Sequence, residues 1–502
     1  MKKKLLYNTA LLTGAALIMR SIGISYQVWL VGRIGAAGIG LFQLVMSVSG
    51  MAVTFAISGI RYACTRLISE EAGLGMWGGV GQVMGRCISY SCFFGISCAA
   101  IMFFGAGPIG FLWIGDARTV LSLRLYAFSL PFISLSSVFA GYFTAMGRVY
   151  KTAAVNILEQ VLRIGLVAFF LELVPAGELE SSCAAVVLAG TIAELFSFCL
   201  TVSLYLLDRR RHAMSGESSP RLTPRMLAVA LPLALSAYTR TSLSTLEHLL
   251  VPRGLKAAGL SSDSALAGYG VIQGMVFPII WFPSSFLLAL AEMLVPDMTE
   301  AQMSGRHDYI SLTANSLIAK CLAFSVGAAG TLYAFAGPLG DAVYKSAEAG
   351  RYIEVFALLA PVIYLDMVAD GMLKGLGQQM HSMAYNIADS LISVILVYTL
   401  IPRYALTAYI MIICFTECFN FFMSITRLRK VAALELELRD LLLPLISAAA
   451  SASLARLILS GLNFDPAASV PSVLSAVALS LLLYAAFLTT LDSTFRPAPK
   501  KC

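Results

Sequence analysis

Arg20 is the first residue of the chain whose chemistry needs an explanation. It lies near the middle of the apolar stretch LLTGAALIMRSIGISYQVWLVGRIG at residues 11–35, which has the length and composition of a membrane-spanning helix. A charged side chain at the centre of such a helix costs about 2.5–3.5 kcal/mol on insertion scales. Ionisable residues in such helices usually face a bundle interior or a water-filled cavity, so Arg20 is a candidate binding residue.

A second arginine, Arg240, lies in a comparable apolar stretch in the second half of the chain. Gln27 follows Arg20 by two helical turns and shares its face, while Ser244 and Glu247 extend the corresponding stripe from Arg240. A guanidinium offers a planar fork of donors that matches the geometry of phosphate oxygens. If both arginines face one cavity, they predict an anionic substrate such as a phosphate or pyrophosphate.

Structural roles for these arginines remain open alternatives. Glu247 could neutralise Arg240, and Arg20 could donate to backbone carbonyls of a neighbouring helix. Arg163 has a stronger structural explanation, because Glu159 lies four residues earlier, in the order that favours an ion pair on a helix. We therefore expect Glu159 and Arg163 to pair with each other.

Acidic and amide residues in the second half form another candidate site. Asp366 and Asp370 lie one helical turn apart in one apolar stretch, and Asn386 and Asp389 lie in the next. Oxygen ligands suit hard cations, and carboxylates inside membranes also carry protons. These four residues are candidates for binding a coupling ion, either Na⁺ or H⁺. The sequence offers no evident partner for Asp366.

No pattern of residues predicts catalysis, a metal centre or a resident cofactor. Most of the ten cysteines lie in apolar runs, where a thiol packs as a small apolar group. Cys414 and Cys418 lie one turn apart but lack the further cysteines or histidines that a zinc site needs. The four histidines are scattered along the chain. We therefore expect a protein that is not an enzyme and that has no cofactor apart from a coupling ion.

The composition is typical of a polytopic α-helical membrane protein. Of the 502 residues, 58% are hydrophobic and only 13% are charged, whereas soluble domains are about a quarter charged. The mean hydropathy is +0.81. The sequence begins MKKKLLYN, but no small-residue cleavage site follows the first apolar region. We expect an uncleaved first membrane helix.

The apolar runs predict about fourteen transmembrane helices with short connections. The longest polar connection, at residues 208–225, follows the sixth helix. The predicted spans are residues 5–30, 38–60, 86–106, 119–143, 152–174, 182–207, 226–250, 266–292, 310–337, 352–373, 382–402, 405–427, 441–461 and 470–491.

Lys and Arg in the connections predict the orientation of these spans. With the N-terminus inside, 22 of the 35 basic residues lie in inside segments, 8 lie in outside segments and 5 lie within spans. Cytoplasmic loops carry the excess of basic residues, so both termini should be cytoplasmic. The net charge of +7 then reflects topology and gives no reason to expect a nucleic-acid partner.

The two halves of the chain carry an internal repeat. At an offset of 230 residues, PFISLSSVFAGYFTAMGR at 131–148 matches PVIYLDMVADGMLKGLGQ at 361–378. The pairs in this register include Pro131 with Pro361, Gly141 with Gly371, Gly147 with Gly377 and Asn156 with Asn386. The four glycines are more typical of helix ends and close packing than of a ligand loop. The first spans align at an offset of 220, which places Arg20 on Arg240.

The repeat predicts two six-helix lobes with the same orientation. Six spans separate the repeats, so the lobes should be related by an axis along the membrane normal and should face each other across a central cavity. The predicted division is an N-terminal lobe at 1–215, a C-terminal lobe at 216–430, and two additional helices with a cytoplasmic tail at 431–502. We expect a monomer.

The N-terminal region resembles a known family of transporters. The run MRSIGISYQVWLVGRIGAAGIGLFQLVMSVSGMAVTFAISGIRYACTRLISEE is similar to the stage V sporulation protein B branch of the polysaccharide transporters. These are grouped with lipid II flippases and multidrug and toxin extruders in one exporter superfamily. The most specific pieces are Arg20-Ser-Ile-Gly, residues 35–43, and Gly59-Ile-Arg61 continuing to Arg66.

The resemblance implies an alternating-access flippase for a lipid-linked oligosaccharide or a peptidoglycan precursor in the cell membrane. In lipid II flippases, arginines in the cavity are thought to hold the pyrophosphate, and Arg20 matches one of these positions. A second arginine of that pattern is replaced here by Tyr26, while Arg61 adds a further candidate for substrate binding. The last two helices of those flippases form a groove for the lipid tail, and the spans at 441–461 and 470–491 match them by position. The branch name suggests sporulation, although relatives in it need not serve that process.

Two other functions are weighed against this one. A multidrug exporter of the same superfamily typically has twelve spans and an acidic cavity, which fits the extra pair of spans and the arginines poorly. A membrane glycan polymerase needs a large external loop with catalytic residues, but the outside connections here are short. The sequence therefore favours the flippase.

Overall fold

The computed structural model describes residues 2–175, 177–211, 221–435 and 437–495, and within these ranges the elements are helices without a β-strand. Part of the predicted polar connection at 208–225 and the predicted tail at 496–502 lie outside the described residues. Contacts between residues divide the chain into two units. Unit 1 comprises Met1–Tyr26 and Ile34–Ala267, and unit 2 comprises Gln27–Arg33 and Gly268–Cys502.

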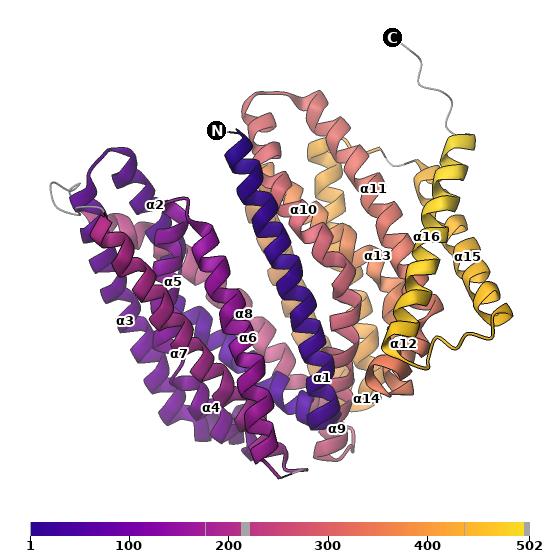
Figure 1. Cartoon of the computed structure of the whole chain (residues 1–502), viewed down its shortest axis with the longest axis horizontal. Coiled ribbons are helices and arrows are strands. Elements are labelled where there is room, and N and C mark those ends of the chain that lie inside the picture. Colours follow the sequence, from indigo (N-terminus) through magenta and orange to yellow (C-terminus); the bar gives the residue numbers. More distant parts are fainter. Residues whose placement is uncertain (1, 176, 212–220, 436, 496–502) are drawn as a thin grey trace. The chain divides into compact units, whose positions relative to one another are not determined.

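The long first helix α1 contributes to both units, and helices α2 to α9 belong mainly to unit 1 (Figure 1). Their bounds are α1 Lys2–Ile57, α2 Ile60–Gly73, α3 Trp77–Pro108, η1 Ile109–Ile114, η2 Ala117–Thr119, α4 Val120–Ala127, α5 Leu130–Ala145, α6 Val149–Leu173, α7 Leu179–Arg211, α8 Leu222–Ala257 and α9 Ser262–Gly270.

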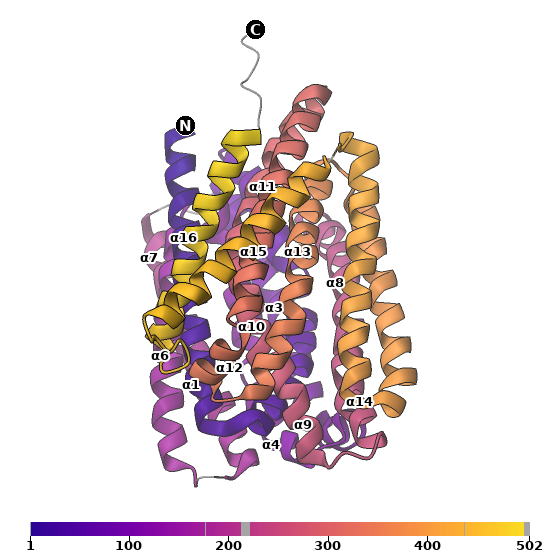
Figure 2. The ribbon, with the colours of Figure 1, turned by 90° about the vertical axis from the view of Figure 1, so that its right-hand side faces the viewer.

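Unit 2 contains the remaining helices, and its last two helices, α15 and α16, lie side by side (Figures 1 and 2). The bounds are η3 Val271–Val276, α10 Phe277–Met303, α11 His307–Ala334, α12 Ala336–Tyr344, α13 Ala347–Gly375, α14 Gln379–Ala432, α15 Leu438–Gly461 and α16 Val470–Phe495.

The chain is a multi-pass α-helical membrane protein. Eleven described helices are long and apolar enough to cross a membrane, or twelve if α4 and α5, which are bent by 45°, form one span. Two of the eleven have 55 and 54 residues. At 1.5 Å per residue each could cross a layer of about 30 Å twice. They are kinked at Gly35 and Ala405, where the sequence predicts connections, but the count of fourteen stays a prediction.

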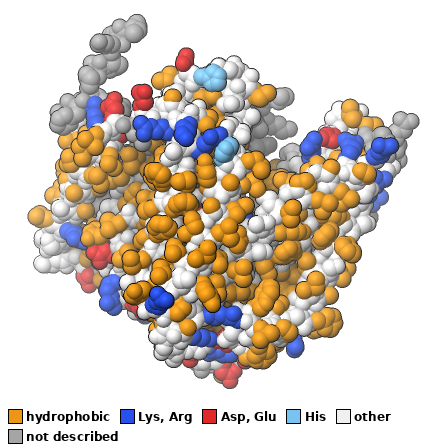
Figure 3. Space-filling model, turned by 180° about the vertical axis from the view of Figure 1, so that it is seen from behind, with side chains coloured by type: hydrophobic (Ala, Val, Ile, Leu, Met, Phe, Trp, Pro, Cys, Tyr) orange, Lys and Arg blue, Asp and Glu red, His pale blue; other side chains and the backbone are white. Residues whose placement is uncertain are grey.

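The outer surface has the apolar character that lipid requires. Figure 3 shows hydrophobic side chains over the middle of one face, with Lys, Arg, Asp and Glu gathered toward its two ends. On α3, for example, Phe93, Ile101 and Phe104 are exposed, Phe104 by 80%. Large apolar side chains exposed on one helix would be unfavourable in water and are stable against hydrocarbon.

The core of unit 1 is built from α2, α3, α5, α7 and α8. Ile60 and Leu67 of α2 are buried together with Met226 and Ala230 of α8. A charged contact reinforces this packing, because Arg225 at the start of α8 pairs with Glu70 and Glu71 at the end of α2. By contacts, therefore, α8 belongs to unit 1, although the predicted C-terminal lobe begins at residue 216. The predicted lobe boundaries stay a prediction.

Four glycine turns are built in the same way and follow the internal repeat. Gly75, Gly147, Gly305 and Gly377 have φ of 74°, 66°, 65° and 68°. The amide after each glycine donates to the carbonyl five residues back, as Arg148 does to Phe143 at 2.8 Å and Gln378 to Leu373 at 2.8 Å. This is the Schellman pattern, which requires the left-handed conformation that glycine adopts most easily. The turns pair at the 230-residue offset, Gly75 with Gly305 and Gly147 with Gly377.

The other two glycines of the repeat lie at close contacts between helices. A Cβ added at Gly141 would lie 2.9 Å from the carbonyl oxygen of Arg61, and one at Gly371 would lie 2.8 Å from the Cβ of Ala291. Gly147 and Gly377 thus lie at helix ends, and Gly141 and Gly371 lie at close contacts. The prediction that the four glycines of the repeat mark helix ends and close packing is confirmed.

Candidate functional site

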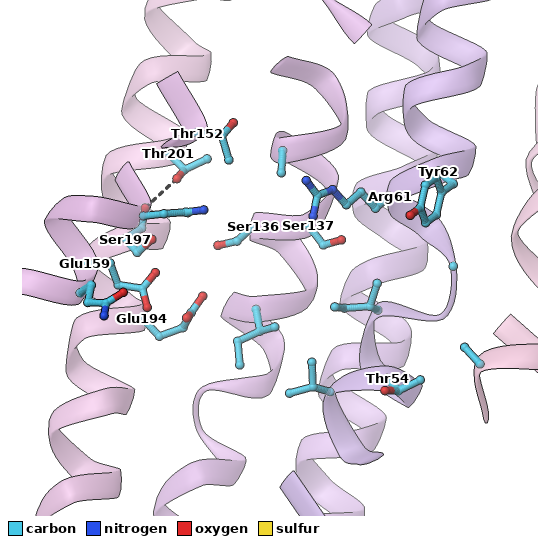
Figure 4. Close-up of a pocket in the computed structure, with 18 of the residues that line it drawn as sticks. Thr54, Arg61, Tyr62, Ser136, Ser137, Thr152, Glu159, Glu194, Ser197 and Thr201 are labelled. Atoms are coloured by element: carbon cyan, nitrogen blue, oxygen red, sulfur yellow. Dashed lines mark hydrogen bonds between the residues drawn. The ribbon is translucent and has the colours of Figure 1, made fainter. Parts of the chain in front are cut away.

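Unit 1 encloses a polar cavity of about 720 Å³ among α1, α2, α5, α6, α7 and α8. Figure 4 shows Arg61 and Tyr62 on one side of it, with Ser136 and Ser137 between them and the two glutamates, Glu159 and Glu194. The polar lining residues are Thr54, Arg61, Tyr62, Ser136, Ser137, Thr152, Asn156, Glu159, Gln160, Arg163, Glu194, Ser197 and Thr201.

The charges of this cavity are concentrated on α6 and α7. Glu159 and Arg163 form an ion pair one helical turn apart, which confirms the pairing predicted from their spacing. Glu194 of α7 lines the cavity beside them. Arg163 and Glu194 also line a second cavity of about 90 Å³, so these two residues lie where the cavities meet.

Several buried polar atoms of the lining lack a protein partner. Ser136 Oγ, Ser137 Oγ, Thr152 Oγ1 and Arg163 Nε accept or donate no hydrogen bond among the described residues. Ser137 is only 8% exposed. Because a buried polar group without a hydrogen bond is costly, these atoms require water or a polar ligand in the cavity. The lining therefore suits water or a polar molecule.

Unit 2 holds a polar cluster between α13 and α14. The amide nitrogen of Asn420 lies 3.1 Å from Asp366 Oδ2 and 3.3 Å from Asn386 Oδ1. The Asn386 amide donates to the carbonyl of Ser382 at 2.9 Å, and the Ser382 hydroxyl donates to Asp370. Three of the four predicted coupling-ion residues are thus linked, and the partner that the sequence did not reveal for Asp366 is Asn420.

Acceptor oxygens dominate the unsatisfied atoms of this cluster. Asp366 Oδ1 and Asn420 Oδ1 are buried and accept no hydrogen bond in the described part of the chain. Asp370 also pairs with Lys374 at 2.5 Å, so its charge is compensated. No group of three or more His, Cys, Asp or Glu residues with metal-binding geometry occurs among the described residues.

The residues predicted to bind substrate do not gather at one described cavity. Among them, Arg61 alone lines the 720 Å³ cavity within the described residues. Arg20 is partly buried, whereas Arg240 is exposed, and Ser244 and Glu247 near it are partly buried.

Gln27 makes a contact that the sequence did not predict. Its amide donates to the Gly274 carbonyl of the π-helix η3 at 3.2 Å, and both residues belong to unit 2. A π-helical turn leaves backbone groups without their usual helical partners. The hydrogen bond from Gln27 therefore stabilises this turn by satisfying one of its carbonyl groups.

A charged cluster joins the connection after α3 to the start of α9. Arg118 contacts Asp116 Oδ2 at 2.8 Å and Asp263 Oδ1 at 2.8 Å, while Lys256 donates to the Gly115 carbonyl at 3.1 Å. Burial alone would raise the pKa of Asp116, but the hydrogen bonds and charge of Arg118 outweigh it and hold this pKa below its ordinary value. Asp116 is therefore an ionised anchor for Arg118 at neutral pH.

Glu194, Asn420 and the hydroxyl lining of unit 1 were not anticipated as site residues. A signal for Glu194 was present, because a glutamate inside an apolar span is a functional candidate by default. The serines and threonines gave no comparable signal, since such residues are frequent in membrane helices. The sequence cannot show which of them lose their backbone partners and face a cavity.

Comparison with solved structures finds the same fold in two membrane transport proteins. The chain aligns with a lipid II flippase, MurJ, in an inward closed conformation, with a TM-score of 0.73 and 12% identity, over 96% of this chain and 99% of that one. It aligns with an inward-facing multidrug resistance transporter of the MOP superfamily with a TM-score of 0.65 and 14% identity, over 83% of this chain and 96% of that one. At these identities the similarity shows the fold.

Comparison of sequences identifies the family. Stage V sporulation protein B of Bacillus subtilis (strain 168) is 23% identical over 407 residues, which are 80% of this chain and 79% of that protein. Sporulation protein YkvU of the same organism is 23% identical over 279 residues, and the match spans 61% of that protein. The family model described as polysaccharide biosynthesis protein matches residues 5–302. The chain belongs to this polysaccharide biosynthesis protein family.

Proposed function

We propose that this chain is an alternating-access flippase that exports a lipid-linked oligosaccharide or a peptidoglycan precursor across the cytoplasmic membrane. Such a substrate is an anionic pyrophosphate lipid. The observation that carries the proposal is the extent of the alignment with the lipid II flippase, which covers 96% of this chain, whereas the multidrug transporter covers 83%. Membership of the polysaccharide biosynthesis family supports a glycan as the cargo.

Two alternatives are less well supported. A multidrug exporter shares the fold, but its alignment is less complete. A glycan polymerase would need a large external connection with catalytic residues, and the predicted outside connections are short. The proposal therefore treats the chain as a transporter and not as an enzyme.

We assign Arg20 and Arg240 to the pyrophosphate. The two residues align in the internal repeat, and each lies within a membrane helix, where an unneeded charge is costly. Gln27, Arg61, Ser244 and Glu247 complete the proposed substrate contacts. The contact from Gln27 to Gly274 gives that residue a structural role as well.

The cluster of unit 2 is the proposed site for the coupling ion. Asp366, Asp370, Asn386 and Asp389 supply oxygen atoms, and the unsatisfied atoms at this cluster are acceptors. Acceptors without donors are satisfied by a cation, such as Na⁺, or by a proton on one carboxylate. The ion would stabilise one conformation of the transport cycle by binding it more tightly than the other.

The test is transport of defined fluorescent lipid-linked sugars in proteoliposomes by Arg20→Ala and Arg240→Ala. A hydrogen bond to a charged group contributes about 1.5–3 kcal/mol, so each change should weaken substrate binding by roughly one to two decades. Arg20→Lys should restore transport only partly, because an ammonium keeps the charge but loses the planar fork.

The matched control is Lys320→Ala, which removes another basic residue from a membrane helix and should transport normally. Folding of each variant is checked by its elution profile in detergent and its thermal transition. If both well-folded arginine variants transport at the wild-type rate, the arginines do not hold the substrate.

A further inference from the structure

Glu194 is a carboxyl group in the cavity of unit 1 for which the described residues supply no ion-pair partner of its own. Its neighbour Glu159 is paired with Arg163. Glu194 itself forms no ion pair and accepts no hydrogen bond among the residues that the structure describes, although it interacts electrostatically with both members of that pair. Two carboxylates therefore share one guanidinium inside the membrane-spanning part of unit 1.

Water can reach this carboxylate from the larger cavity. The cavity of about 720 Å³ extends from Arg61 and Thr152 to Glu194, and it is far larger than a single cation needs. Ser137 is 8% exposed and its Oγ has no partner in the described ranges, and Figure 4 shows it between the glutamates and Arg61. A row of unsatisfied hydroxyl groups is satisfied by water molecules, which can relay protons.

A second, smaller cavity shares the lining residues Arg163 and Glu194 with the first. It has a volume of about 90 Å³ and is lined by Tyr26, Tyr126 and Ser129 as well as by Arg163 and Glu194. Glu194 thus lines two cavities, and the smaller one also has the apolar residues Phe42, Met46 and Val187 in its lining. A group placed between two cavities can take up a proton from one side and release it to the other when access changes.

The charged and titratable groups that line the two cavities beside Glu194 belong, among the described residues, to unit 1. Glu159 and Arg163 approach it from α6, Tyr126 approaches from α4 and Tyr26 from α1. Arg61 and Tyr62 of α2 lie at the other end of the larger cavity. Arg163 is already paired with Glu159. A proton on Glu194 would therefore remove the excess negative charge at this end of the cavity.

The repeat places a glutamate at the equivalent position of unit 2 as well, but two other residues of the site differ. The segment Glu194-Leu-Phe-Ser-Phe aligns with Glu417-Cys-Phe-Asn-Phe, which lies 223 residues later. In this register Ser197 aligns with Asn420, the residue that binds Asp366. Arg163 corresponds to Ser393 at the offset of 230, so unit 2 has a hydroxyl at this position where unit 1 has a guanidinium. The two polar sites therefore occupy equivalent helices but differ in charge.

We propose that Glu194 is a proton-binding site within unit 1, separate from the ion site assigned to unit 2. A carboxylate oxygen takes the proton from a hydrated proton in the cavity and leaves water behind, so no bond other than O–H changes and nothing is oxidised or reduced. Protonation and release at this residue couple the proton gradient to the conformation of unit 1. This site lies beyond the flippase function itself, which requires only a path for the substrate.

The experiment uses dicyclohexylcarbodiimide, an apolar reagent that modifies protonated carboxyl groups, on the full chain in proteoliposomes. Peptide mass spectrometry should find the adduct on Glu194, in several-fold larger amount at about pH 5 than at about pH 8. Glu194→Gln should remove this adduct. Glu159, which is paired with Arg163, is the internal control and should stay unmodified, and Glu172→Gln on the exposed end of α6 should leave the Glu194 signal unchanged.

Labelling of Glu194 that is absent, or equal at both pH values, would overturn the proposal. Protection of Glu194 by Na⁺ but not by choline would also overturn it and would assign the site to a sodium ion. Because the labelling needs no lipid substrate, its outcome is independent of the flippase proposal. Loss of transport in Arg20→Ala should leave the labelling of Glu194 intact.

Discussion

The guanidinium of Arg118 makes two contacts that differ in burial, one with Asp116 and one with Asp263. The Asp116 side chain is 6% exposed, whereas the Asp263 side chain is 66% exposed, although both lie 2.8 Å from Arg118. A contact between exposed charges is screened by water and contributes about 0–1 kcal/mol. Asp116 additionally accepts from the Arg118 backbone amide at 3.1 Å, which makes it the N-cap of the short helix η2.

We expect Asp116→Asn to lower stability much more than Asp263→Asn. The first change weakens a buried charged contact that is worth about 1–3 kcal/mol, and the second removes a screened contact worth less than about 1 kcal/mol. The measurement is the thermal transition of each purified variant in detergent at neutral pH. Equal losses in the two variants would contradict the assignment.

The pH dependence gives the same prediction a second test. The pKa of Asp116 is lowered in the folded protein, so its contribution to stability is present above its unfolded pKa of about 3.9 and is lost as the pH falls through the folded pKa. The difference between wild type and Asp116→Asn should therefore persist at neutral pH and shrink in strong acid. A difference that grows on acidification would have the wrong sign.

At the scale of residues, the sequence predicted pairs that depend on local spacing and missed those that depend on packing. Glu159 and Arg163 lie one turn apart on a helix, so their pairing follows from helical geometry alone. Asp366 and Asn420 are 54 residues apart and meet only because α13 packs against the second part of α14. Because Asp366 has no partner at helical spacing, the sequence alone could not predict its contact.

At the scale of elements, the long apolar runs predicted the helices well but not how they are joined. The sequence predicts connections near residues 30–38 and 402–405, whereas α1 and α14 continue through these positions with a kink. A single residue with non-helical backbone angles produces each kink. This residue is Gly35 in α1, with φ 71°, and Ala405 in α14, with φ 51°. Glycine is a recognisable signal for such a conformation, but alanine is not.

The sequence also did not predict the broken helices or the π-helical segments. The predicted span at 119–143 is divided into α4 and α5, and the span at 266–292 begins as α9, continues through η3 and ends as α10. A π-helical turn depends on contacts that replace the ordinary hydrogen bonds, such as that of Gln27 with Gly274. Hydropathy records the apolar length of a segment but contains no information about these contacts.

At the scale of the whole chain, similarity and packing partition the helices differently. The repeat shows that the first spans of the two halves resemble each other, but the contacts assign Leu222–Ala257 to unit 1 and Gln27–Arg33 to unit 2. A repeat in sequence identifies segments with the same local pattern of side chains. It does not determine which neighbours these side chains pack against, because apolar faces of membrane helices are largely interchangeable in composition.

The orientation of the chain is predicted by its basic residues. We expect a cysteine at Ser262, introduced into a background without native cysteines, to react with an impermeant thiol reagent added outside, and a cysteine at Ser218 to be spared. Ser218 lies outside the described residues, in the predicted cytoplasmic connection. Permeabilised cells provide the control, because both positions should then react. Labelling of Ser218 alone in intact cells would reverse the topology.

The dependence of transport on membrane voltage tests the charge that crosses the membrane. If the substrate moves outward as an anion, an inside-negative potential favours the step by about 2.3 kcal/mol per charge per 100 mV. Because 1.4 kcal/mol corresponds to a factor of ten, transport should accelerate by at most roughly fifty-fold per net charge at that potential. The measurement is the initial rate of flipping in proteoliposomes in which a potassium gradient and an ionophore set the potential.

The same experiment distinguishes a bare anion from an anion that moves with its coupling ion. One cation carried in the same direction for each negative charge cancels the electrical work, so the rate would then depend on the Na⁺ or H⁺ gradient and not on voltage. A cation that moves inward as the anion moves outward adds to the voltage dependence instead. Acceleration that survives removal of both gradients would assign the charge to the substrate. A rate that falls as the interior becomes more negative would contradict outward movement of an anion and, with it, the direction of transport proposed here.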